Sequence, residues 1–161
     1  MTISAGDRMP EGTLVCMNRD GPKEFDVTEL FEGKKIVLFS VPGAFTPTCS
    51  KKHLPGYIGN FKAIKQKGID AVACLAVNDI HVMHAWGKSV GADDSVLMLA
   101  DGNCTYTTAL GMELDLFGAN MGRRGKRFSA VIDDGIVTLL NIEPPREFGI
   151  SSAEALLKQL L

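Results

Sequence analysis

The sequence lacks the features that mark several large classes of protein. It has no Cys-x-x-Cys pair and no cluster of cysteine and histidine with zinc-ligand spacing, so no structural zinc site is expected. No apolar run approaches 18 residues, so we expect no membrane-spanning helix. The formal net charge is only −2, which predicts no general attraction to nucleic acid or to an anionic membrane. The first residues have neither the basic nor the apolar segment of a signal peptide, and the cytoplasm is the predicted location.

The length and composition favour one folded unit. We expect a single domain over residues 1–161, with 45% hydrophobic and 22% charged residues, as in ordinary globular proteins. A chain of this size buries roughly 70% of its unfolded surface and needs no disulfide or metal to stabilise it. Its four cysteines are far apart in the sequence and are expected to be thiols, one of them reactive. They are Cys16, Cys49, Cys74 and Cys104.

Strand and helix patterns alternate along the chain. Strands are predicted at Thr13–Met17, Lys35–Ser40, Ala71–Val77, Val96–Ala100, Arg127–Asp133 and Ile136–Ile142. Helices are predicted at Val27–Phe31, Cys49–Lys67, Ile80–Val90, Thr105–Leu110 and Ser152–Leu161. This order predicts an α/β fold with a central mixed sheet flanked by helices, an N-terminal hairpin extension, and an insertion near residues 102–126.

Local signals mark the ends of some of these elements. Asp134-Gly135 is a strong hairpin signal, and Asp79 is a suitable N-cap for the following helix. Ser151 and Glu154 have the spacing of a capping box, which predicts the start of the last helix. In the helix from Ile80, the apolar side is expected to include Val82, Ala85, Trp86 and Val90.

The segment around Cys49 points to a reactive thiol. A β-prone apolar run ends in a loop that carries Cys49 to the predicted start of a helix, where unpaired backbone N–H groups stabilise a thiolate. Pro42 stiffens this loop, and the hydroxyl of Thr46 can donate one hydrogen bond while it accepts another. The loop itself supplies no cation. Arg127 is the preferred candidate, because it adjoins a predicted strand and its guanidinium offers several fixed donors.

The pattern Pro42-x-x-x-Thr46-x-x-Cys49 resembles the active site of the peroxiredoxins, and the string Pro-Gly-Ala-Phe-Thr-Pro-Thr-Cys-Ser is similar to the atypical type II branch. This resemblance implies a thioredoxin-like fold, with which the order of elements is compatible. It also implies thiol-dependent reduction of hydrogen peroxide and alkyl hydroperoxides, in antioxidant defence. By motif, Cys49 is the peroxidatic nucleophile, Thr46 the active-site hydroxyl, Arg127 the arginine and Pro42 the loop proline. His53 is similar to a histidine that supports this site in the family.

The resemblance leaves the regeneration of Cys49 open. The oxidised cysteine is a sulfenic acid, which a second thiol must attack. The segment before the last helix has no cysteine, whereas Cys74 lies 25 residues after Cys49, the spacing of one branch of the family. Either Cys74 is the resolving thiol, or glutathione, with glutaredoxin, attacks directly; thioredoxin is the other candidate reductant. No cofactor or metal is expected, and the family implies a homodimer.

Other functions would require different residues from those around Cys49. A disulfide oxidoreductase would require a second cysteine close to Cys49, and a non-enzymatic peroxide sensor would oxidise once without turnover. Cys49 is interpreted as reactive rather than as a buried structural thiol because of its sequence context. His81 and His84 have a spacing that suits a metal, but no third ligand is evident, and Trp86 is interpreted as core packing.

Overall fold

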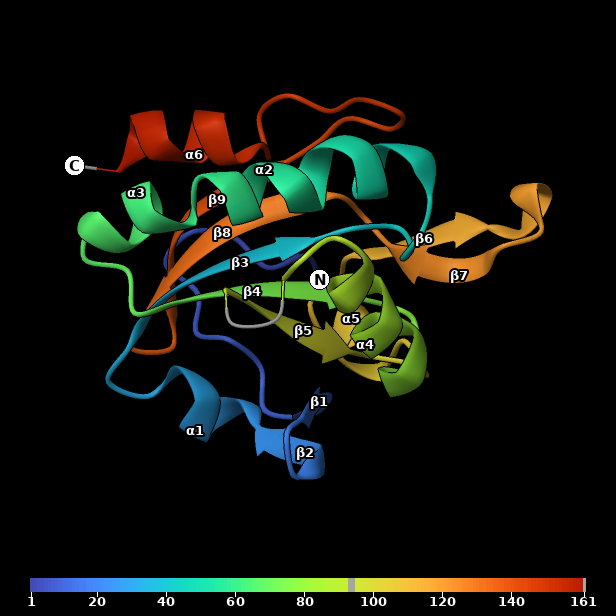
Figure 1. The fold of residues 1–161 in the computed structure, drawn as a ribbon, viewed down its shortest axis with the longest axis horizontal. Coiled ribbons are helices and arrows are strands. Elements are labelled where there is room, and N and C mark those ends of the chain that lie inside the picture. Colours follow the sequence, from blue (N-terminus) through green and yellow to red (C-terminus); the bar gives the residue numbers. More distant parts are fainter. Residues whose placement is uncertain (93–94, 161) are drawn as a thin grey trace.

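A seven-stranded sheet forms the centre of the computed structural model, which describes residues 1–92 and 95–160 (Figure 1). The sheet has the order β2-β1-β5-β4-β3-β8-β9, and a separate two-stranded sheet pairs β6 with β7. The strands are β1 (Thr13–Asn18), β2 (Gly21–Asp26), β3 (Lys35–Ser40), β4 (Ala71–Ala76), β5 (Val96–Ala100), β6 (Glu113–Leu116), β7 (Gly122–Gly125), β8 (Phe128–Asp133) and β9 (Ile136–Ile142). The three central strands β3, β4 and β5 run parallel, and the outer strands pair antiparallel.

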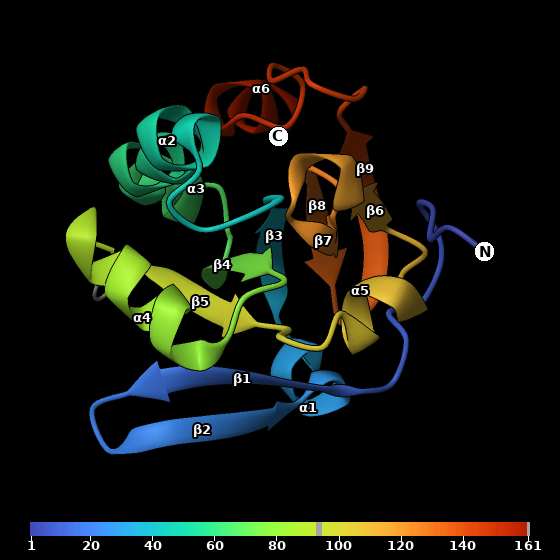
Figure 2. The same ribbon diagram turned by 90° about the vertical axis from the view of Figure 1, so that its right-hand side faces the viewer.

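Helices cover both faces of this sheet. They are α1 (Val27–Phe31), the π-helical turn η1 (Cys49–His53), α2 (Leu54–Gly59), α3 (Phe61–Gln66), α4 (Ile80–Ser89), α5 (Thr105–Ala109), the 3-10 turn η2 (Phe117–Ala119) and α6 (Ala153–Gln159). Helices α2, α3, α4 and α6 pack on one face, and α1 and α5 on the other (Figure 2). The expected α/β fold with a central mixed sheet and an N-terminal hairpin, β1–β2, is confirmed.

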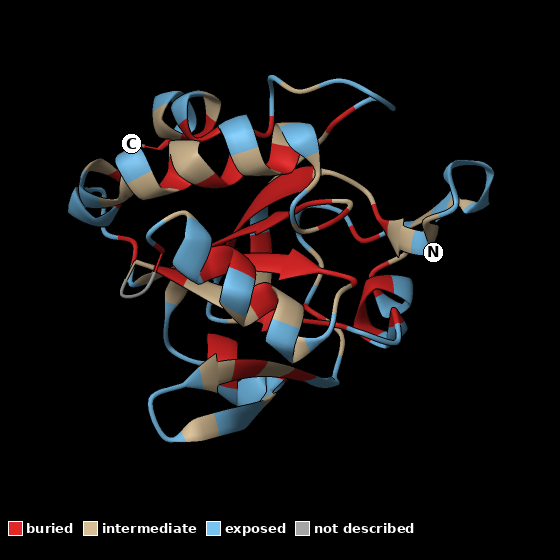
Figure 3. Ribbon diagram, turned by 45° about the vertical axis from the view of Figure 1, so that its right-hand side comes forward, coloured by how far each residue is buried: buried red, intermediate tan, exposed pale blue. Residues whose placement is uncertain are grey.

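The alternation of side chains along β3 explains why both faces are covered. Val37 and Phe39 belong to the core beneath α2 and α6, whereas Ile36 and Leu38 belong to the core beneath α1 and α5. All four are at most 1% exposed, as expected for an internal strand with hydrophobic residues at every position. The buried strands between partly exposed helices are visible in Figure 3. Because β3 is central, the loop that follows it is held at the end of a rigid element.

Two predicted boundary signals are confirmed. The Asp79 carboxylate accepts hydrogen bonds from the backbone N–H groups of His81 and Val82 at 2.8 and 2.9 Å, and so caps α4. Asp134 and Gly135 join β8 to β9 with positive φ angles of 49° and 82°, as a tight hairpin turn requires.

Other expectations about the elements were wrong. The N-cap of α6 is Ser152, whose hydroxyl accepts from the Ala155 N–H, because the Ser151 hydroxyl is used by Glu143 instead. The helix predicted over residues 49–67 is divided into η1, α2 and α3. In α4 the predicted core residue Trp86 is buried, but its buried neighbours are Met83 and Gly87. Of the other predicted residues, Ala85 is exposed, and Val82 and Val90 are only partly buried.

The insertion near residues 102–126 forms α5 and the β6–β7 hairpin with η2 at its tip, which projects from the body in Figure 1. Among the described residues, no helix is long and apolar enough to cross a membrane.

Candidate active site

The loop after β3 places Cys49 in the first turn of a helix. Phe45 has a φ of 64°, which is uncommon for a bulky residue and is typical of loops with a functional geometry. Its side chain is 55% exposed and faces outward. The Ser50 N–H donates to the Thr46 carbonyl at 2.9 Å, so the helical conformation already includes Cys49. In a first turn, backbone N–H groups lack helical acceptors and favour a negative charge nearby.

A π-helical turn follows Cys49. The Leu54 N–H bonds to the carbonyl of Cys49, five residues back, instead of to Ser50. The extra residue in this turn changes the direction in which the following side chains point. As a result both Cys49 and His53 face the core, and both are 0% exposed. Rare π turns of this kind occur preferentially at functional sites.

Arg127 supplies the cation that the loop lacks. Its Nη2 donates to the Cys49 sulfur at 3.1 Å, a contact that stabilises the thiolate over the thiol. Arg127 directly precedes β8, whose strand partner β3 leads into the Cys49 loop. The predicted pairing of Cys49 with Arg127 is therefore present in the geometry.

His53 holds the arginine in this position. Arg127 Nη1 lies 2.8 Å from His53 Nδ1, and His53 Nε2 lies 3.1 Å from the Ser151 carbonyl. A guanidinium has no lone pair to offer, so Nδ1 is the acceptor, and the proton is on Nε2, which donates to Ser151. Burial and the charge of Arg127 lower the pKa of His53 to about 3. The imidazole is therefore neutral at physiological pH.

Aromatic rings surround the histidine and arginine pair. The Phe148 ring centroid lies 5.7 Å from the Arg127 guanidinium and 5.0 Å from the His53 ring. On the opposite side, Tyr57 stacks on Phe39 with ring centroids 4.0 Å apart. The rings limit the access of water to the pair, and so strengthen the electrostatic contact of Arg127 with sulfur.

Thr46 and Pro42 lie in the same loop. The Thr46 hydroxyl donates to the Gly43 carbonyl at 2.7 Å, so its oxygen keeps lone pairs with which to accept a hydrogen bond from a substrate. Pro42 lines the pocket beside Arg127. The structure therefore brings Pro42, Thr46, Cys49, His53 and Arg127 into one region.

Arg124, the other arginine of this segment, has a different set of partners. Its Nε donates to the Met121 carbonyl at 2.8 Å and its Nη1 to the Val77 carbonyl at 3.1 Å. These bonds join the β6–β7 hairpin to the segment after β4. Arg124 therefore supports the scaffold around the loop, whereas Arg127 contacts the sulfur.

The other three cysteines are buried away from solvent. Cys74 lies in the central strand β4 and is 0% exposed, and burial raises the pKa of its thiol well above the usual range, with a contribution from Cys49. Burial also raises the pKa of Cys16, and Lys23 partly opposes this. Cys104 is also buried, with 5% of its surface exposed. All four cysteines are free thiols.

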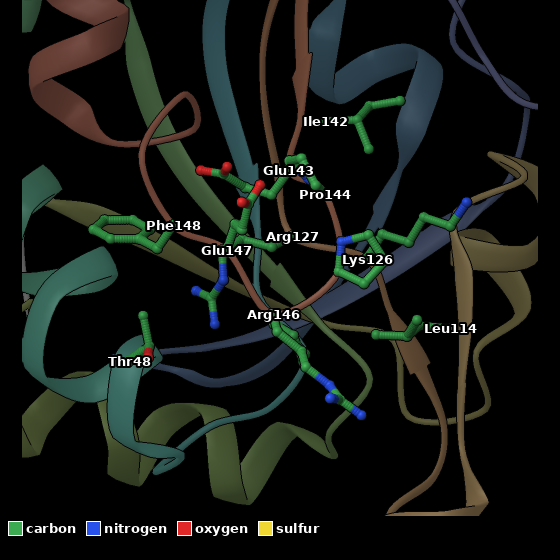
Figure 4. Close-up of a pocket in the computed structure, with 12 residues that line it drawn as sticks. Thr48, Leu114, Lys126, Arg127, Ile142, Glu143, Pro144, Arg146, Glu147 and Phe148 are labelled. Carbon is green, nitrogen blue, oxygen red and sulfur yellow. The ribbon is translucent and has the colours of Figure 1, made fainter.

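A pocket of about 230 Å³ opens beside Arg127. In Figure 4, Phe148, Arg127 and Thr48 lie on one side of this pocket, and Lys126 and Leu114 lie on the other. Its remaining lining consists of Pro42 and the segment from Ile142 to Glu147. Cys49 does not line this pocket itself, but its sulfur contacts the lining residue Arg127, whose Nη2 donates to it at 3.1 Å.

Comparison with known proteins places this arrangement in a family. The Redoxin family matches residues 4–157. The chain is a peroxiredoxin of the Redoxin family. It is 50% identical over 99% of its length to Peroxiredoxin-2E-2, chloroplastic, from Oryza sativa subsp. japonica, of which it covers 73%. It is 46% identical to Peroxiredoxin-2C from Arabidopsis thaliana, over 98% of each chain.

A solved structure agrees with this assignment. Reduced Prx3 from Vibrio vulnificus, crystallised in complex with hydrogen peroxide, is 48% identical and superimposes with a TM-score of 0.96 over 99% of this chain and 100% of that chain. The resemblance to type II peroxiredoxins and the thioredoxin-like fold are confirmed. The protein is thus a thiol-dependent peroxidase with an antioxidant function, which acts on peroxide with thiol reductants.

Sequence reasoning missed three residues of the site: Glu143, Ser151 and Phe148. Glu143 is 8% exposed and accepts hydrogen bonds from the segment that carries the other two. Nothing in the local sequence marks them, because their roles depend on contacts between α2, β9 and the segment before α6. The one available signal was Glu143 itself, which directly follows the predicted strand Ile136–Ile142. Glutamate is rarely buried unless it is paired, so a buried glutamate there would indicate a special role.

Proposed function

We propose that Cys49 is the peroxidatic nucleophile of this peroxiredoxin and that Arg127 and Thr46 are its catalytic partners. The contact of 3.1 Å between the Arg127 guanidinium and the Cys49 sulfur is the observation that carries this proposal. It supplies the positive charge that a reactive thiolate needs, at a sulfur that is also in the first turn of a helix.

The reaction follows from this geometry. The thiolate electron pair forms a bond to the terminal oxygen of the hydroperoxide, and the O–O bond breaks. The other oxygen leaves with the electron pair and takes a proton from solvent, which gives an alcohol or water and a Cys49 sulfenic acid. Arg127 and the Thr46 hydroxyl hold the two oxygens while charge moves to the leaving one, and this stabilises the transition state.

The pocket beside Arg127 supports both hydrogen peroxide and alkyl hydroperoxides as substrates. Its walls include the apolar side chains Leu114, Ile142 and Phe148 and the rings of Pro144 and Pro145. A volume of about 230 Å³ accommodates an alkyl group as well as the two peroxide oxygens. The apolar walls can bind the alkyl group while the guanidinium binds the oxygens.

We propose that an external thiol regenerates the enzyme. Cys74 is completely buried in the middle of the sheet between β3 and β5, and its raised pKa disfavours the thiolate required for attack. Glutathione would attack the sulfenic sulfur, form an S–S bond and release the hydroxyl as water with one proton. Glutaredoxin would then remove the glutathione by thiol–disulfide exchange, with thioredoxin as the alternative reductant.

This step requires movement of η1. Cys49 is 0% exposed. In the sulfenic acid, the oxygen bound to the Cys49 sulfur would face the pocket from which the peroxide came. A thiol that attacks in line with the S–O bond must approach the side of the sulfur that faces the core. The sulfur must therefore turn outward before it is reduced.

We also propose that the protein is a homodimer and is located in the cytoplasm. The exposed Phe45 and Phe117, 55% and 63% exposed, lie in the Cys49 loop and at the tip of the β6–β7 hairpin, and support a contact between copies near the site. Because relatives include proteins named chloroplastic and mitochondrial, fractionation of cells of the source organism is the test of the location. Analytical ultracentrifugation tests the dimer.

The test of the function is Cys49→Ser with Cys104→Ser as a matched control. The first should abolish peroxide consumption with glutathione and glutaredoxin, and the second should leave it intact. The same assay with thioredoxin identifies the reductant. A wild-type protein that consumes one equivalent of peroxide and then stops with every reductant would support the non-enzymatic sensor instead.

A further inference from the structure

Glu143 is a buried carboxylate that is not in contact with the sulfur. Its Oε2 atom accepts hydrogen bonds from the Gly149 N–H at 2.6 Å, the Ser151 N–H at 2.8 Å and the Ser151 hydroxyl at 2.7 Å. Burial raises the pKa of Glu143, but these bonds and one from the Ile150 N–H lower it more, so the net shift is downward. The carboxylate is therefore ionised and fixes the segment before α6.

This segment presents one carbonyl to the interior. The Ser151 carbonyl accepts from His53 Nε2 at 3.1 Å and from the Tyr57 hydroxyl at 2.7 Å. Glu143 binds the N–H and hydroxyl of the same residue. The orientation of Ser151, and with it the direction of its carbonyl, is thus set by Glu143 on one side and by the two aromatic donors on the other.

The hydrogen bond to the Ser151 carbonyl determines which nitrogen of His53 carries the proton. As long as Ser151 accepts from Nε2, the proton stays there and Nδ1 remains an acceptor. Only this tautomer can accept from Arg127 Nη1, which lies 2.8 Å from Nδ1. If the proton moved to Nδ1, its N–H would face the N–H of the guanidinium, and Arg127 would have to leave its place beside Cys49.

We propose that Glu143 is a positioning residue for peroxide reduction, which orients the Ser151 carbonyl, fixes the His53 tautomer and thereby holds Arg127 against the Cys49 sulfur. The backbones of Glu143 and Arg127 are also joined directly, because the Glu143 N–H donates to the Arg127 carbonyl at 3.0 Å. The inference rests on the proposed roles of Cys49 and Arg127. It adds a residue whose carboxylate acts through Ser151 and His53 and has no hydrogen bond to the Cys49 sulfur among the described residues.

The test compares Glu143→Gln with Asp101→Asn. Asp101 is a matched control, because it is 6% exposed and its carboxylate also accepts backbone N–H groups, from Tyr106 at 3.2 Å and Thr107 at 2.7 Å, but it has no bond to His53, Ser151 or Arg127 among the described residues. Each variant replaces a buried carboxylate by an amide of the same shape. Both should therefore lose thermal stability.

Only Glu143→Gln should affect the chemistry. We expect its second-order rate constant for oxidation by hydrogen peroxide, measured by stopped flow without reductant, to fall about tenfold or more, as when a group that orients a reacting residue is lost. In nitrogen-15 spectra, the wild-type His53 should show the Nε2–H tautomer, and the variant should show a mixture.

If Glu143→Gln has an unchanged oxidation rate and unchanged His53 signals but a lower melting temperature, Glu143 has only a structural role and the proposal is wrong. If Glu143→Gln does not fold, Ser151→Ala is the decisive variant, because it removes one hydrogen bond to Glu143 and keeps the backbone N–H bond. A smaller loss of oxidation rate and a smaller change in the His53 signals would support the proposal. The absence of both changes would overturn it. A wild-type His53 with its proton on Nδ1 also overturns it. Failure of the proposed function would appear differently, as a wild-type enzyme whose peroxide consumption does not depend on Cys49.

Discussion

Replacement of Arg127 by alanine is expected to slow the oxidation of Cys49 severely. The variant loses a charged hydrogen bond of 3.1 Å to the sulfur. Such a bond contributes about 1.5–3 kcal/mol, which corresponds to about 10- to 150-fold in rate at 1.36 kcal/mol per factor of ten. The same guanidinium is proposed to hold the leaving oxygen, and loss of a donor of that kind typically costs about 10²–10³ in rate. We therefore expect a loss of at least about tenfold and at most about a thousandfold.

The change has a second consequence that must be separated from the first. Without Arg127, the buried Nδ1 of His53 has lost its partner, and an unsatisfied buried group costs about 1–3 kcal/mol of stability. The melting temperature should be measured first, and the rate then determined well below it. Arg127→Lys keeps the charge but cannot contact both His53 and Cys49 with a planar fork, so its rate should lie between those of the wild type and of the alanine variant.

The assay is stopped-flow oxidation of the fully reduced protein by hydrogen peroxide, without any reductant, so that only the first chemical step is observed. Arg124→Ala is the control, because Arg124 donates to the Met121 and Val77 carbonyls and not to the sulfur. It should change the rate by less than about threefold, equivalent to roughly 0.7 kcal/mol. A larger loss in Arg124→Ala than in Arg127→Ala would refute the assignment of the cation.

Three further predictions concern other residues. Thr46→Val should lower the rate of Cys49 oxidation, and Thr46→Ser should preserve most of it, because only serine retains a hydroxyl in place of the one that donates to Gly43; equal rates in the stopped-flow assay would contradict this. Cys74→Ser should keep full turnover with glutathione and glutaredoxin, since the thiol is 0% exposed; a loss of turnover in a variant that folds would indicate an obligatory internal disulfide. The pKa of His53 is lowered from 6.5 to about 3, so the unfolded chain binds the extra proton between these values and stability should rise with pH across that window. The slope due to this group is at most about 1.4 kcal/mol per pH unit, and urea unfolding between pH 4 and 6.5 should show a smaller slope for His53→Gln than for the wild type.

The parts of the fold that follow from local sequence were predicted well. β3 was predicted with its observed bounds, Lys35–Ser40, because an uninterrupted apolar run followed by a loop rich in proline is unambiguous. The position of Cys49 at a helix start followed from the same stretch. The π turn after it was not predictable, since no residue type distinguishes a bond to the fifth preceding carbonyl from one to the fourth.

The errors arose where tertiary contacts changed a local preference. Ser151 and Ser152 are both suitable caps for α6, and Ser152 caps because Glu143 binds the Ser151 hydroxyl. In α4, Gly87 faces β5, where an added Cβ atom would lie 2.9 Å from Met98 Cγ. The helix therefore turns its glycine, and not Ala85, toward the sheet. Neither contact is visible before the chain is folded.

The active site shows the same division between local and distant information. The motif around Cys49 predicts the nucleophile, because the sulfur, the hydroxyl and the turn all lie within one loop of eight residues. The position of the cation, in contrast, depends on a chain of hydrogen bonds from Cys49 through Arg127 and His53 to Ser151, and these residues lie up to 102 positions apart. Each bond in that chain has only one direction in which a proton can be donated, because a guanidinium only donates and a carbonyl only accepts. Under the proposal made above, the orientation of a backbone carbonyl in the last eleven residues controls the reactivity of a thiol in the first half of the sequence. A motif that ends at Cys49 contains no information about that carbonyl.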